Sequence, residues 1–315
     1  MGKTKVGVVG IGHLGNYHLQ KYQKIDNVEI VGAVDIDLSK AEKAAGIFGC
    51  RAYTDHRDLV ENVDAVSITV PAQHHHFVAR DFLAAGKDVL IEKPFTATLQ
   101  EADDLIRLAE EKNLILQVGF IERFNPAIIA LNEVIRQPLF IESHRLHPFI
   151  ERGTDVDVVL DLMIHDLDLI LHYVKSPLKN VEAVGVSVLS DKVDIANVRL
   201  TFETGCVANI TASRVTLKHM PKLRFFGVEG YHSVDFSKRE LVSVKRQARE
   251  GGRIEIGLNE VQVAQHDPLE EEIRAFVGSV TQRTEPPVSG IEARKSLGLA
   301  LLINEKMKTG RDVTL

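Results

Sequence analysis

Short apolar runs alternate with helix-periodic segments over about the first 120 residues of the chain. The apolar runs, rich in valine and isoleucine, lie at residues 6–9, 28–34, 64–70, 88–91 and 114–118. In the segments between them, apolar positions recur every three or four residues, at 14–22, 38–48, 73–85 and 98–112. Runs that are apolar on both faces are typical of buried parallel strands, and the three-to-four period is typical of helices. The pattern therefore predicts a doubly wound α/β domain with a parallel sheet.

The pattern changes beyond about residue 139, where strand-like segments follow one another across short turns instead of helices. One example is the pair Val198–Glu203 and Val207–Thr211, which the dipeptide Thr204-Gly205 separates. Closely spaced strands joined by short glycine turns predict hairpins, and hence an antiparallel sheet. The same part of the chain contains two predicted helices, Val158–Val174 and Ile291–Met307.

The length and composition of the chain fit two domains. With 315 residues and 44% hydrophobic content, the chain is long enough for about two cores. We place the α/β domain at residues 1–121 and an α+β domain with a mainly antiparallel, open sheet at residues 122–315. The formal net charge of -6 and the lack of a long basic run argue against nucleic acid or an anionic membrane as a partner. No apolar stretch approaches the roughly 20 residues of a membrane span.

The cysteines and the start of the chain favour a cytoplasmic protein. Cys50 and Cys206 lie far apart and have no metal-ligand or redox partner nearby in sequence, which is typical of a reducing compartment. Met1 is followed almost at once by a predicted core strand, so we expect no signal peptide. Because an open antiparallel sheet usually finds a partner that covers it, we also expect a homodimer or homotetramer.

A predicted helix follows the first strand directly, across the segment Gly10-Ile11-Gly12-His13-Leu14-Gly15. A G-x-G-x-x-G turn between a strand and a helix is the fingerprint of dinucleotide-binding Rossmann domains. In that motif Gly10 permits the tight turn, Gly12 lets the backbone approach a pyrophosphate, and Gly15 lets helix and strand pack closely. The backbone amides at the helix start then hold the phosphates. We predict that all six residues of this loop contact the cofactor.

An acidic residue ends the second predicted strand, where the ribose of a bound dinucleotide is expected. Asp35 lies 20 residues beyond Gly15, the spacing at which a carboxylate binds the 2′-hydroxyl of the adenosine ribose. A carboxylate there repels the 2′-phosphate of NADP, so the sequence favours NAD as the cofactor. The alternative is a glycine turn of another α/β protein, in which Asp35 only caps the next helix.

Two further strand ends carry polar residues, and ligands of open α/β sheets bind beyond such ends. The run 64–70 leads into Pro71 and three histidines at 74–76, and the run 88–91 leads into Glu92-Lys93-Pro94. Desolvation and the positive charge of oxidised nicotinamide would both lower the pKa of Lys93, so that it can act as a base. The alternative for Lys93 is an ordinary lysine in a solvated loop. The alternative for at least two of the three histidines is a position at the solvated start of a helix. We predict cofactor contacts from Val70, Pro71, His75, Glu92 and Lys93.

The helix predicted at Val158–Val174 carries four polar residues on one stripe. Asp161, His165, Asp168 and His172 are four, three and four residues apart, which stacks them on one helix face. Because the rest of the helix is apolar, these side chains must be paired or must face a cavity. A carboxylate one turn from an imidazole can orient it for acid–base chemistry. A structural hydrogen-bonded network and a metal site are the alternatives; we predict no metal, and structural roles for the last two residues.

Together these motifs resemble the Gfo/Idh/MocA oxidoreductase family over nearly the whole chain. The resemblance rests on the glycine loop with His18 after it, Val70-Pro71 with His75, the segment Ala85–Pro94, and the D-x-x-x-H-x-x-D pattern that begins at Asp161. It implies an enzyme that depends on NAD or NADP and acts on sugars, cyclitols or their derivatives. By position it assigns the catalytic roles to Lys93, Asp161 and His165. Met163 departs from the glycine of many members and is expected to narrow the pocket floor beside His165.

Two further stretches, residues 119–126 and 154–166, resemble the UDP-N-acetylglucosamine 3-dehydrogenase branch of that family. The guanidinium of Arg123 is placed to contact a substrate oxygen or phosphate, and a salt bridge at the domain junction is the equal alternative. We predict substrate contacts from Arg123, Asp161 and His165.

The resemblance predicts an oxidoreductase that transfers a hydride between a sugar hydroxyl or ketone and the nicotinamide of NAD. The expected substrate is a nucleotide sugar such as UDP-N-acetylglucosamine, at C3. Lys93 and His165 share the hydroxyl proton while Asp161 orients the imidazole. A free-sugar or inositol dehydrogenase is the alternative within the family. Outside it, a non-catalytic dinucleotide-binding regulator would have no use for these proton-transfer groups, and a metal-dependent hydrolase would have none for the glycine fingerprint.

Overall fold

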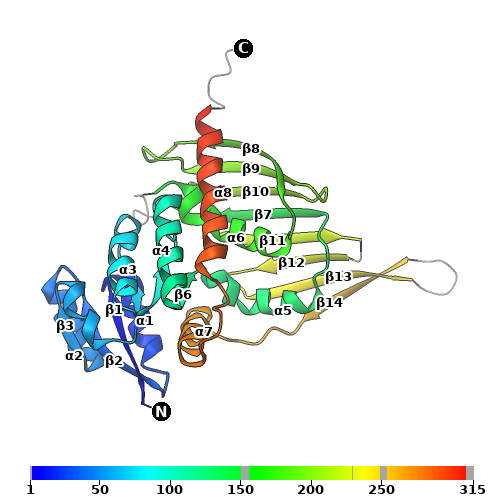
Figure 1. Ribbon diagram of the computed structural model, residues 1–315. Helices are drawn as coiled ribbons and strands as arrows, with labels where there is room; N and C mark the ends of the chain where they lie inside the picture. Colours follow the sequence, from blue (N-terminus) through cyan, green and yellow to red (C-terminus); the bar gives the residue numbers. More distant parts are fainter. Residues whose placement is uncertain (1, 150–155, 229, 249–253, 310–315) are drawn as a thin grey trace. The chain divides into compact units, whose positions relative to one another are not determined.

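The computed structural model describes residues 2–149, 156–228, 230–248 and 254–309, which form two compact units (Figure 1). The first unit comprises the chain up to Ile121 together with Asp267–Arg294, and the second comprises Glu122–His266 and the chain from Lys295. Each unit is built on its own sheet. The sequence-based division assigns residues 267–294 to the second domain, whereas these residues cluster with the first sheet.

The first unit contains the predicted doubly wound parallel sheet. Its strands pair in the order β3-β2-β1-β4-β5-β6, and every pair is parallel. The strands are β1 (Thr4–Val9), β2 (Val28–Val34), β3 (Arg51–Tyr53), β4 (Ala65–Ile68), β5 (Asp88–Glu92) and β6 (Leu116–Gly119). The order reverses between β1 and β4, and ligands of such sheets bind beyond the carboxyl ends of strands at this reversal. The short edge strand β3 is the one strand of this sheet that the apolar pattern does not predict.

Helices and short turns connect these strands as the three-to-four period predicts. The helices are α1 (His13–Tyr22), α2 (Leu38–Phe48), α3 (His75–Ala84) and α4 (Leu99–Lys112). Single 3-10 turns occur at η1 (His56–Asp58), η2 (Val60–Asn62), η3 (Ala72–His74) and η4 (Ile121–Phe124).

Capping residues explain where two of these helices begin and end. Thr98 and Glu101 form a capping box at the start of α4, in which each side chain accepts a hydrogen bond from the other residue's amide, at 3.3 Å and 3.1 Å. Asp37 caps α2 by accepting from the amide two residues further on. Gly49 after α2 and Asn113 after α4 adopt the left-handed backbone that ends a helix. The strand–helix alternation is therefore set locally.

Helix α7 (Pro268–Gln282) belongs to the first unit because its apolar face packs into the core around α1. Ile273 and Phe276 share one buried cluster with Leu19 of α1. An ion pair of 2.7 Å between Lys21 Nζ and Asp267 Oδ2 ties the same two helices together. No helix is predicted here from the sequence, although Asp267 as N-cap and Pro268 in the first turn are local signals of a helix start. The packing of this helix on the first sheet has no such local signal.

The second unit contains the predicted mainly antiparallel sheet. Its strands pair in the order β14-β13-β12-β11-β7-β10-β9-β8, and only β7 and β10 are parallel among the described strands. The strands are β7 (Phe140–Leu146), β8 (Leu178–Val186), β9 (Ile195–Phe202), β10 (Val207–Ser213), β11 (Met220–Gly227), β12 (Gly230–Asp235), β13 (Glu240–Ala248) and β14 (Ile254–Val261). Buried and less buried residues alternate along β7 and β9, so one face of the sheet is covered.

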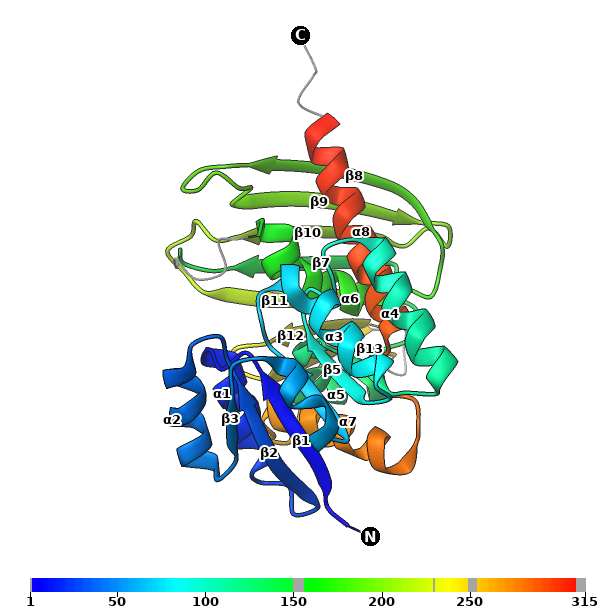
Figure 2. The same cartoon turned by 60° about the vertical axis from the view of Figure 1, so that its left-hand side comes forward.

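Helical segments cover that face. They are α5 (Pro126–Val134), the π-helical turn η5 (Val159–Met163), α6 (Ile164–Tyr173) and α8 (Gly290–Thr309). The later part of α8 runs across β8–β10 (Figures 1 and 2), and Met307 lies so close to Gly185 of β8 that a side chain there would clash. The helix predicted at Val158–Val174 is thus a π turn followed by α6. Helix α5, like α7, is absent from the sequence-based prediction.

Within the described ranges, no helix combines the length and the apolarity that crossing a bilayer requires. Cys206 is buried, Cys50 is half-buried, and both are free.

Candidate active site

The glycine loop has the close approaches that its motif predicts. Gly10 adopts a φ of +95°, and a Cβ there would lie 2.8 Å from the amide nitrogen of Val70. A Cβ on Gly15 would lie 2.0 Å from the carbonyl oxygen of Gly10, whereas Gly12 has open space around it. Thr69 donates from Oγ1 to the Gly10 carbonyl at 2.6 Å, a contact that the sequence analysis misses. Only glycine fits at two of these positions, and the third is open to a ligand.

The start of α1 is suited to hold a phosphate. The helix begins at His13 with Gly12 before it, and no side chain caps its first amides. Uncapped amides and the positive end of a helix dipole bind anions. His13 packs edge-on against Tyr17 at 4.7 Å between ring centroids, and Leu14 packs against the buried core. The first turn of α1 therefore presents backbone donors rather than side chains at the position expected for a pyrophosphate.

Asp35 is bonded directly to the glycine loop. Its Oδ2 accepts from the Ile11 amide at 2.8 Å, and its Oδ1 accepts from the Asp37 amide at 3.0 Å. The cap of α2 is Asp37, so the alternative in which Asp35 caps that helix does not describe this structure. Each carboxylate oxygen has a further acceptor position, which leaves Asp35 able to accept from a ribose hydroxyl.

His75 joins the ends of β4 and β5. It is buried, and its ring nitrogens lie 2.9 Å from the Pro94 carbonyl oxygen and 2.8 Å from that of Val70. Burial lowers the pKa of His75, which favours the neutral ring with one donating nitrogen. The neighbouring His76 bonds instead to Asp104 at 3.0 Å. His75 thereby fixes the segment that contains Lys93, whereas Pro71 is exposed.

Lys93 follows β5 directly and is half-buried. Its backbone amide donates to Oε2 of Glu92 at 3.3 Å. Because His75 holds Pro94 on the other side, the backbone is fixed on both sides of Lys93. Direct contacts thus bring together the glycine loop, Asp35, the ends of β4 and β5, and Lys93, all within the first unit.

A π turn carries Asp161 of the second unit. The turn closes where the Ile164 amide donates to the Val159 carbonyl, and Asp157 caps it by accepting from the Val159 amide at 2.8 Å. Asp161 is half-buried, and His165 on the following α6 is 9% exposed. Single π turns occur frequently at functional sites, because they change which side chains share a helix face. The regular stripe predicted from Asp161 onward is therefore interrupted between its first two members.

Arg123 lies in a buried network of the second unit. Its Nε and Nη2 donate to the two oxygens of Asp168 at 2.5 Å and 3.0 Å, and Nη1 lies 2.5 Å from Nδ1 of His172. Ser296 on α8 donates to the same carboxylate at 3.2 Å. Burial, and then the charge of Arg123, lower the pKa of His172 to about 4, so the imidazole is a neutral acceptor. Asp168 and His172 thus have the structural partners predicted for them, and the salt bridge of Arg123 joins residues of one unit rather than two.

A second buried ion pair was not foreseen. Arg145 on β7 donates to both oxygens of Asp166 at 2.9 Å and to Oε1 of Glu122 at 2.8 Å, and its guanidinium lies over the ring of Phe236. No local signal in the sequence pairs a strand arginine with a helix aspartate. Thr154 and Asp155, which belong to the stretch 154–166, lie outside the described residues.

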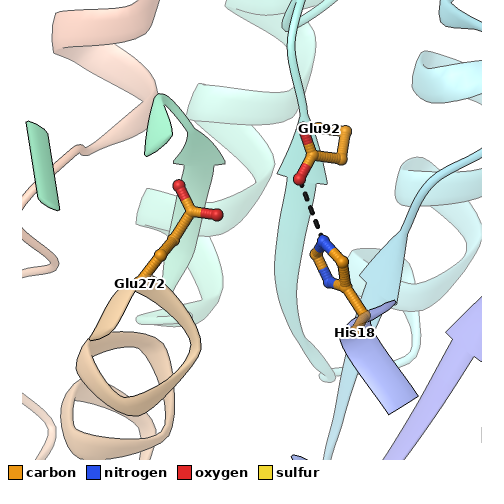
Figure 3. Close-up of side chains that lie close together, drawn as sticks. All are labelled: His18, Glu92 and Glu272. Carbon is orange, nitrogen blue, oxygen red and sulfur yellow. Dashed lines mark hydrogen bonds and ion pairs between the residues drawn. The ribbon is translucent and has the colours of Figure 1, made fainter. Parts of the chain in front are cut away.

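One group of metal-ligand type occurs among the described residues. It consists of His18, Glu92 and Glu272, whose ligand atoms lie within 4.8 Å of one another in the first unit (Figure 3). His18 and Glu92 belong to the motifs that carry the family resemblance, whereas Glu272 belongs to none of them. The polar residues of α6, which were weighed as a metal site, are not part of this group.

A parallel sheet of this order, a glycine loop tied to the acid that ends β2, and an uncapped first helix are typical of a dinucleotide-binding unit. Residues 4–120 match the model of an oxidoreductase family with an NAD-binding Rossmann fold, and residues 137–233 match the GFO/IDH/MocA C-terminal domain. The chain belongs to the Gfo/Idh/MocA family and is an NAD(P)-dependent dehydrogenase that acts on CH–OH groups.

Two relatives illustrate the range of the family. The UDP-N-acetylglucosamine 3-dehydrogenase of Acidithiobacillus ferrooxidans is 39% identical over 301 residues, which cover 95% of this chain and 96% of the relative. A solved structure of that enzyme has a TM-score of 0.92 at 38% identity and covers 98% of this chain and 99% of its own. The myo-inositol 2-dehydrogenase of Thermotoga maritima is 26% identical over 332 residues, 99% of this chain and 98% of the relative.

Proposed function

We propose that this chain oxidises the 3-hydroxyl of UDP-N-acetylglucosamine, or of a closely similar nucleotide sugar, with NAD as hydride acceptor. The observation that carries the proposal is the full-length similarity, at 39% identity, to an enzyme of that name. The stretches 119–126 and 154–166, which resemble the same branch, are the parts of the chain that point to it most directly.

NAD is favoured over NADP because of Asp35. The carboxylate is fixed by the Ile11 amide at 2.8 Å, and it brings a negative charge to the end of β2. A 2′-phosphate would be repelled by that charge, whereas a 2′-hydroxyl can donate to it. The loop Gly10–Gly15 would hold the pyrophosphate. The strand-end residues Val70, Pro71, His75, Glu92 and Lys93 would also contact the cofactor.

The proposed chemistry removes a proton from the sugar hydroxyl and a hydride from its carbon. Bound NAD supplies the hydride acceptor. Lys93 and His165 share the hydroxyl proton, while Asp161 orients the imidazole and Arg123 contributes to substrate binding. Because two interacting groups titrate as a pair, we assign the proton to the pair rather than to one of them. The products are the 3-keto sugar, NADH and one proton.

An inositol dehydrogenase is the second candidate, since a relative of that activity also covers nearly the full chain. The experiment is a comparison of NADH formation with UDP-N-acetylglucosamine, free N-acetylglucosamine and myo-inositol. We expect the highest kcat/KM with the nucleotide sugar. Higher kcat/KM with myo-inositol would replace the first candidate by the second, and tight NAD binding without turnover of any of them would favour a regulator.

We also propose a homodimer or homotetramer. The outer face of β8 exposes Val184 and Val186, at 60% and 51%, and the loop after it exposes Val188 and Leu189, at 56% and 57%. Exposed apolar residues on a sheet typically mark a contact surface. Light scattering on the purified protein measures the assembly directly, and a monomer would remove this proposal.

A further inference from the structure

Three ionisable side chains are buried together at the end of β5, in the first unit (Figure 3). They are His18 on α1, Glu92 on β5 and Glu272 on α7, with exposures of 0%, 7% and 0%. Gln117 of β6 donates to the backbone oxygen of Glu272 at 3.2 Å, which fixes that turn of α7 against the sheet. The proposed mechanism gives these three side chains no chemical step, although Glu92 directly precedes Lys93 and the other two lie beside Glu92.

The carboxylate of Glu92 is held in a defined slot. Its Oε1 lies 3.0 Å from Nε2 of His18, and its Oε2 accepts from the Lys93 amide at 3.3 Å. Gly119 is the neighbour of Glu92 on β6, and a Cβ there would lie 2.9 Å from the carboxylate. Any movement of this carboxylate would therefore disturb the backbone at Lys93.

The contacts of His18 favour its neutral ring with the proton on Nε2. Nε2 faces a carboxylate, so it acts as the donor. Nδ1 is buried and has no hydrogen-bond partner within the described part of the chain. A second proton, on Nδ1, would make the ring a cation with an unpaired N–H donor in the core. That state costs more free energy than an unpaired lone pair on Nδ1 of the neutral ring. Glu92 therefore accepts a hydrogen bond on each carboxylate oxygen, one from Nε2 of His18 and one from the Lys93 amide.

Glu272 has a different environment, because neither of its carboxyl oxygens has a hydrogen-bond partner in the described ranges. Figure 3 shows its carboxyl turned toward Glu92 and His18. Burial, and then the charge of Glu92, raise the pKa of Glu272 well above its usual range. Tyr22 on α1 also interacts electrostatically with Glu272, but its hydroxyl, which is hydrogen-bonded to Ser67 at 2.7 Å, carries no positive charge. Two ionised carboxylates at this site would repel each other without a compensating cation from these neighbours.

We propose that Glu272 is a carboxylic acid that shares its proton with the carboxylate of Glu92, and that His18, Glu92 and Glu272 together position Lys93. The statement about Lys93 rests on the proposed function. The pair then carries one negative charge instead of two, as in other buried carboxyl pairs. Carboxyl oxygens of Glu272 and Glu92 lie within 4.8 Å of each other. At that separation, a small rotation of Glu272 or one bridging water molecule is enough for its O–H to reach Glu92.

The protonation of Glu272 is tested by the variant E272Q, a neutral amide of nearly the same shape. A carboxyl group whose pKa is raised on folding stabilises the folded state fully below the unfolded pKa, and that contribution is lost as the pH rises toward the folded pKa. The melting temperature of the wild-type protein should therefore fall relative to E272Q as the pH rises above the ordinary value of 4.5. E110Q, at an exposed glutamate of α4, controls for the loss of one surface charge.

Two results would contradict the proposal that Glu272 is protonated. One is a difference in melting temperature between wild type and E272Q that stays constant with pH. The other is a divalent cation bound stoichiometrically to the purified wild-type protein and lost in E272Q, because a metal ligand must be the carboxylate. Neither measurement needs turnover, so both remain decisive if the proposed substrate is wrong.

The positioning of Lys93 is tested by a matched pair at His18. H18Q keeps an N–H donor near the position of Nε2, whereas H18L keeps a similar volume without a donor. We expect H18L to lower kcat by about tenfold to 100-fold, because a small misplacement of an acting group is costly, with the Kd for NAD little changed. H18Q should recover most of that loss. Equal kcat in H18L and wild type, or equal losses in both variants, would overturn the positioning role.

Discussion

The two units fix their candidate functional side chains in different ways. In the first unit Asp35 and His75 bond to the backbone: Asp35 accepts from a loop amide, and His75 lies between two strand-end carbonyls. In the second unit the contacts run between charged side chains: Arg123 is bonded through two nitrogens to Asp168 on α6.

Because of this difference, we expect substitutions in the first unit to affect mainly function and substitutions in the second unit to affect mainly stability. A side chain that bonds only to the backbone leaves no unpaired buried charge behind when it is replaced, so a change at Asp35 should alter cofactor binding and leave the fold intact. A buried ion pair is different, because removing one partner leaves the other charge unpaired in the core. Substitutions beside α6 should therefore act first on stability.

The largest effect is expected for R123M in the second unit. Arg123 and Asp168 have side-chain exposures of 8% and 1%, so the variant leaves a buried carboxylate with Ser296 as its remaining donor. We expect a loss of about 3–5 kcal/mol in the free energy of unfolding, measured by denaturant titration. The double variant R123M/D168L, which removes both charges, should recover most of it. If R123M lowers the free energy of unfolding by less than about 1 kcal/mol, the Arg123–Asp168 pair contributes no more than an ordinary surface ion pair. The proposed difference in stability effects between the two units would then be wrong.

The first unit was predictable because its signals are local. Strand, glycine turn, helix and acid follow one another within 35 residues, and Gly10 and Gly15 are required by close contacts, such as Gly15 against the Gly10 carbonyl. The packing of helix α7 was not predictable in this way, because Ile273 and Phe276 enter that core from the far end of the sequence.

The second unit shows where a sequence pattern is insufficient. The spacing of His165, Asp168 and His172 correctly indicated a helix with a polar stripe, but not the π turn before it. Asp168 and His172 of that stripe bond to Arg123, which lies 45 residues or more away in the chain. The spacing of the stripe residues carries no information about so distant a partner. Glu272 was missed for the same reason, since its environment is assembled from three separate elements.

A smaller effect, on turnover alone, is expected for K93A in the first unit. The backbone around Lys93 is fixed by Glu92 and by His75, so removing the side chain should not change the fold. We expect kcat to fall by about 100-fold or more, with the Kd for NAD nearly unchanged, because the proton-transfer group is lost. K112A, at an exposed lysine of α4, is the matched control and should keep its activity. A near-normal kcat in K93A would remove Lys93 from the mechanism.

The smallest effect is expected for D35S, which acts on cofactor choice. The variant loses the acceptor for the Ile11 amide and the charge that disfavours a 2′-phosphate. We expect NAD to bind about tenfold more weakly, and the ratio of the NADP to the NAD dissociation constants to fall, because one charged hydrogen-bond acceptor is removed. D37S is the matched control: it removes the nearby carboxylate, leaves a serine that can also cap α2, and should not change the ratio. If D35S and D37S shift the ratio equally, the selectivity comes from the general charge of this turn and not from the carboxylate bonded to the glycine loop.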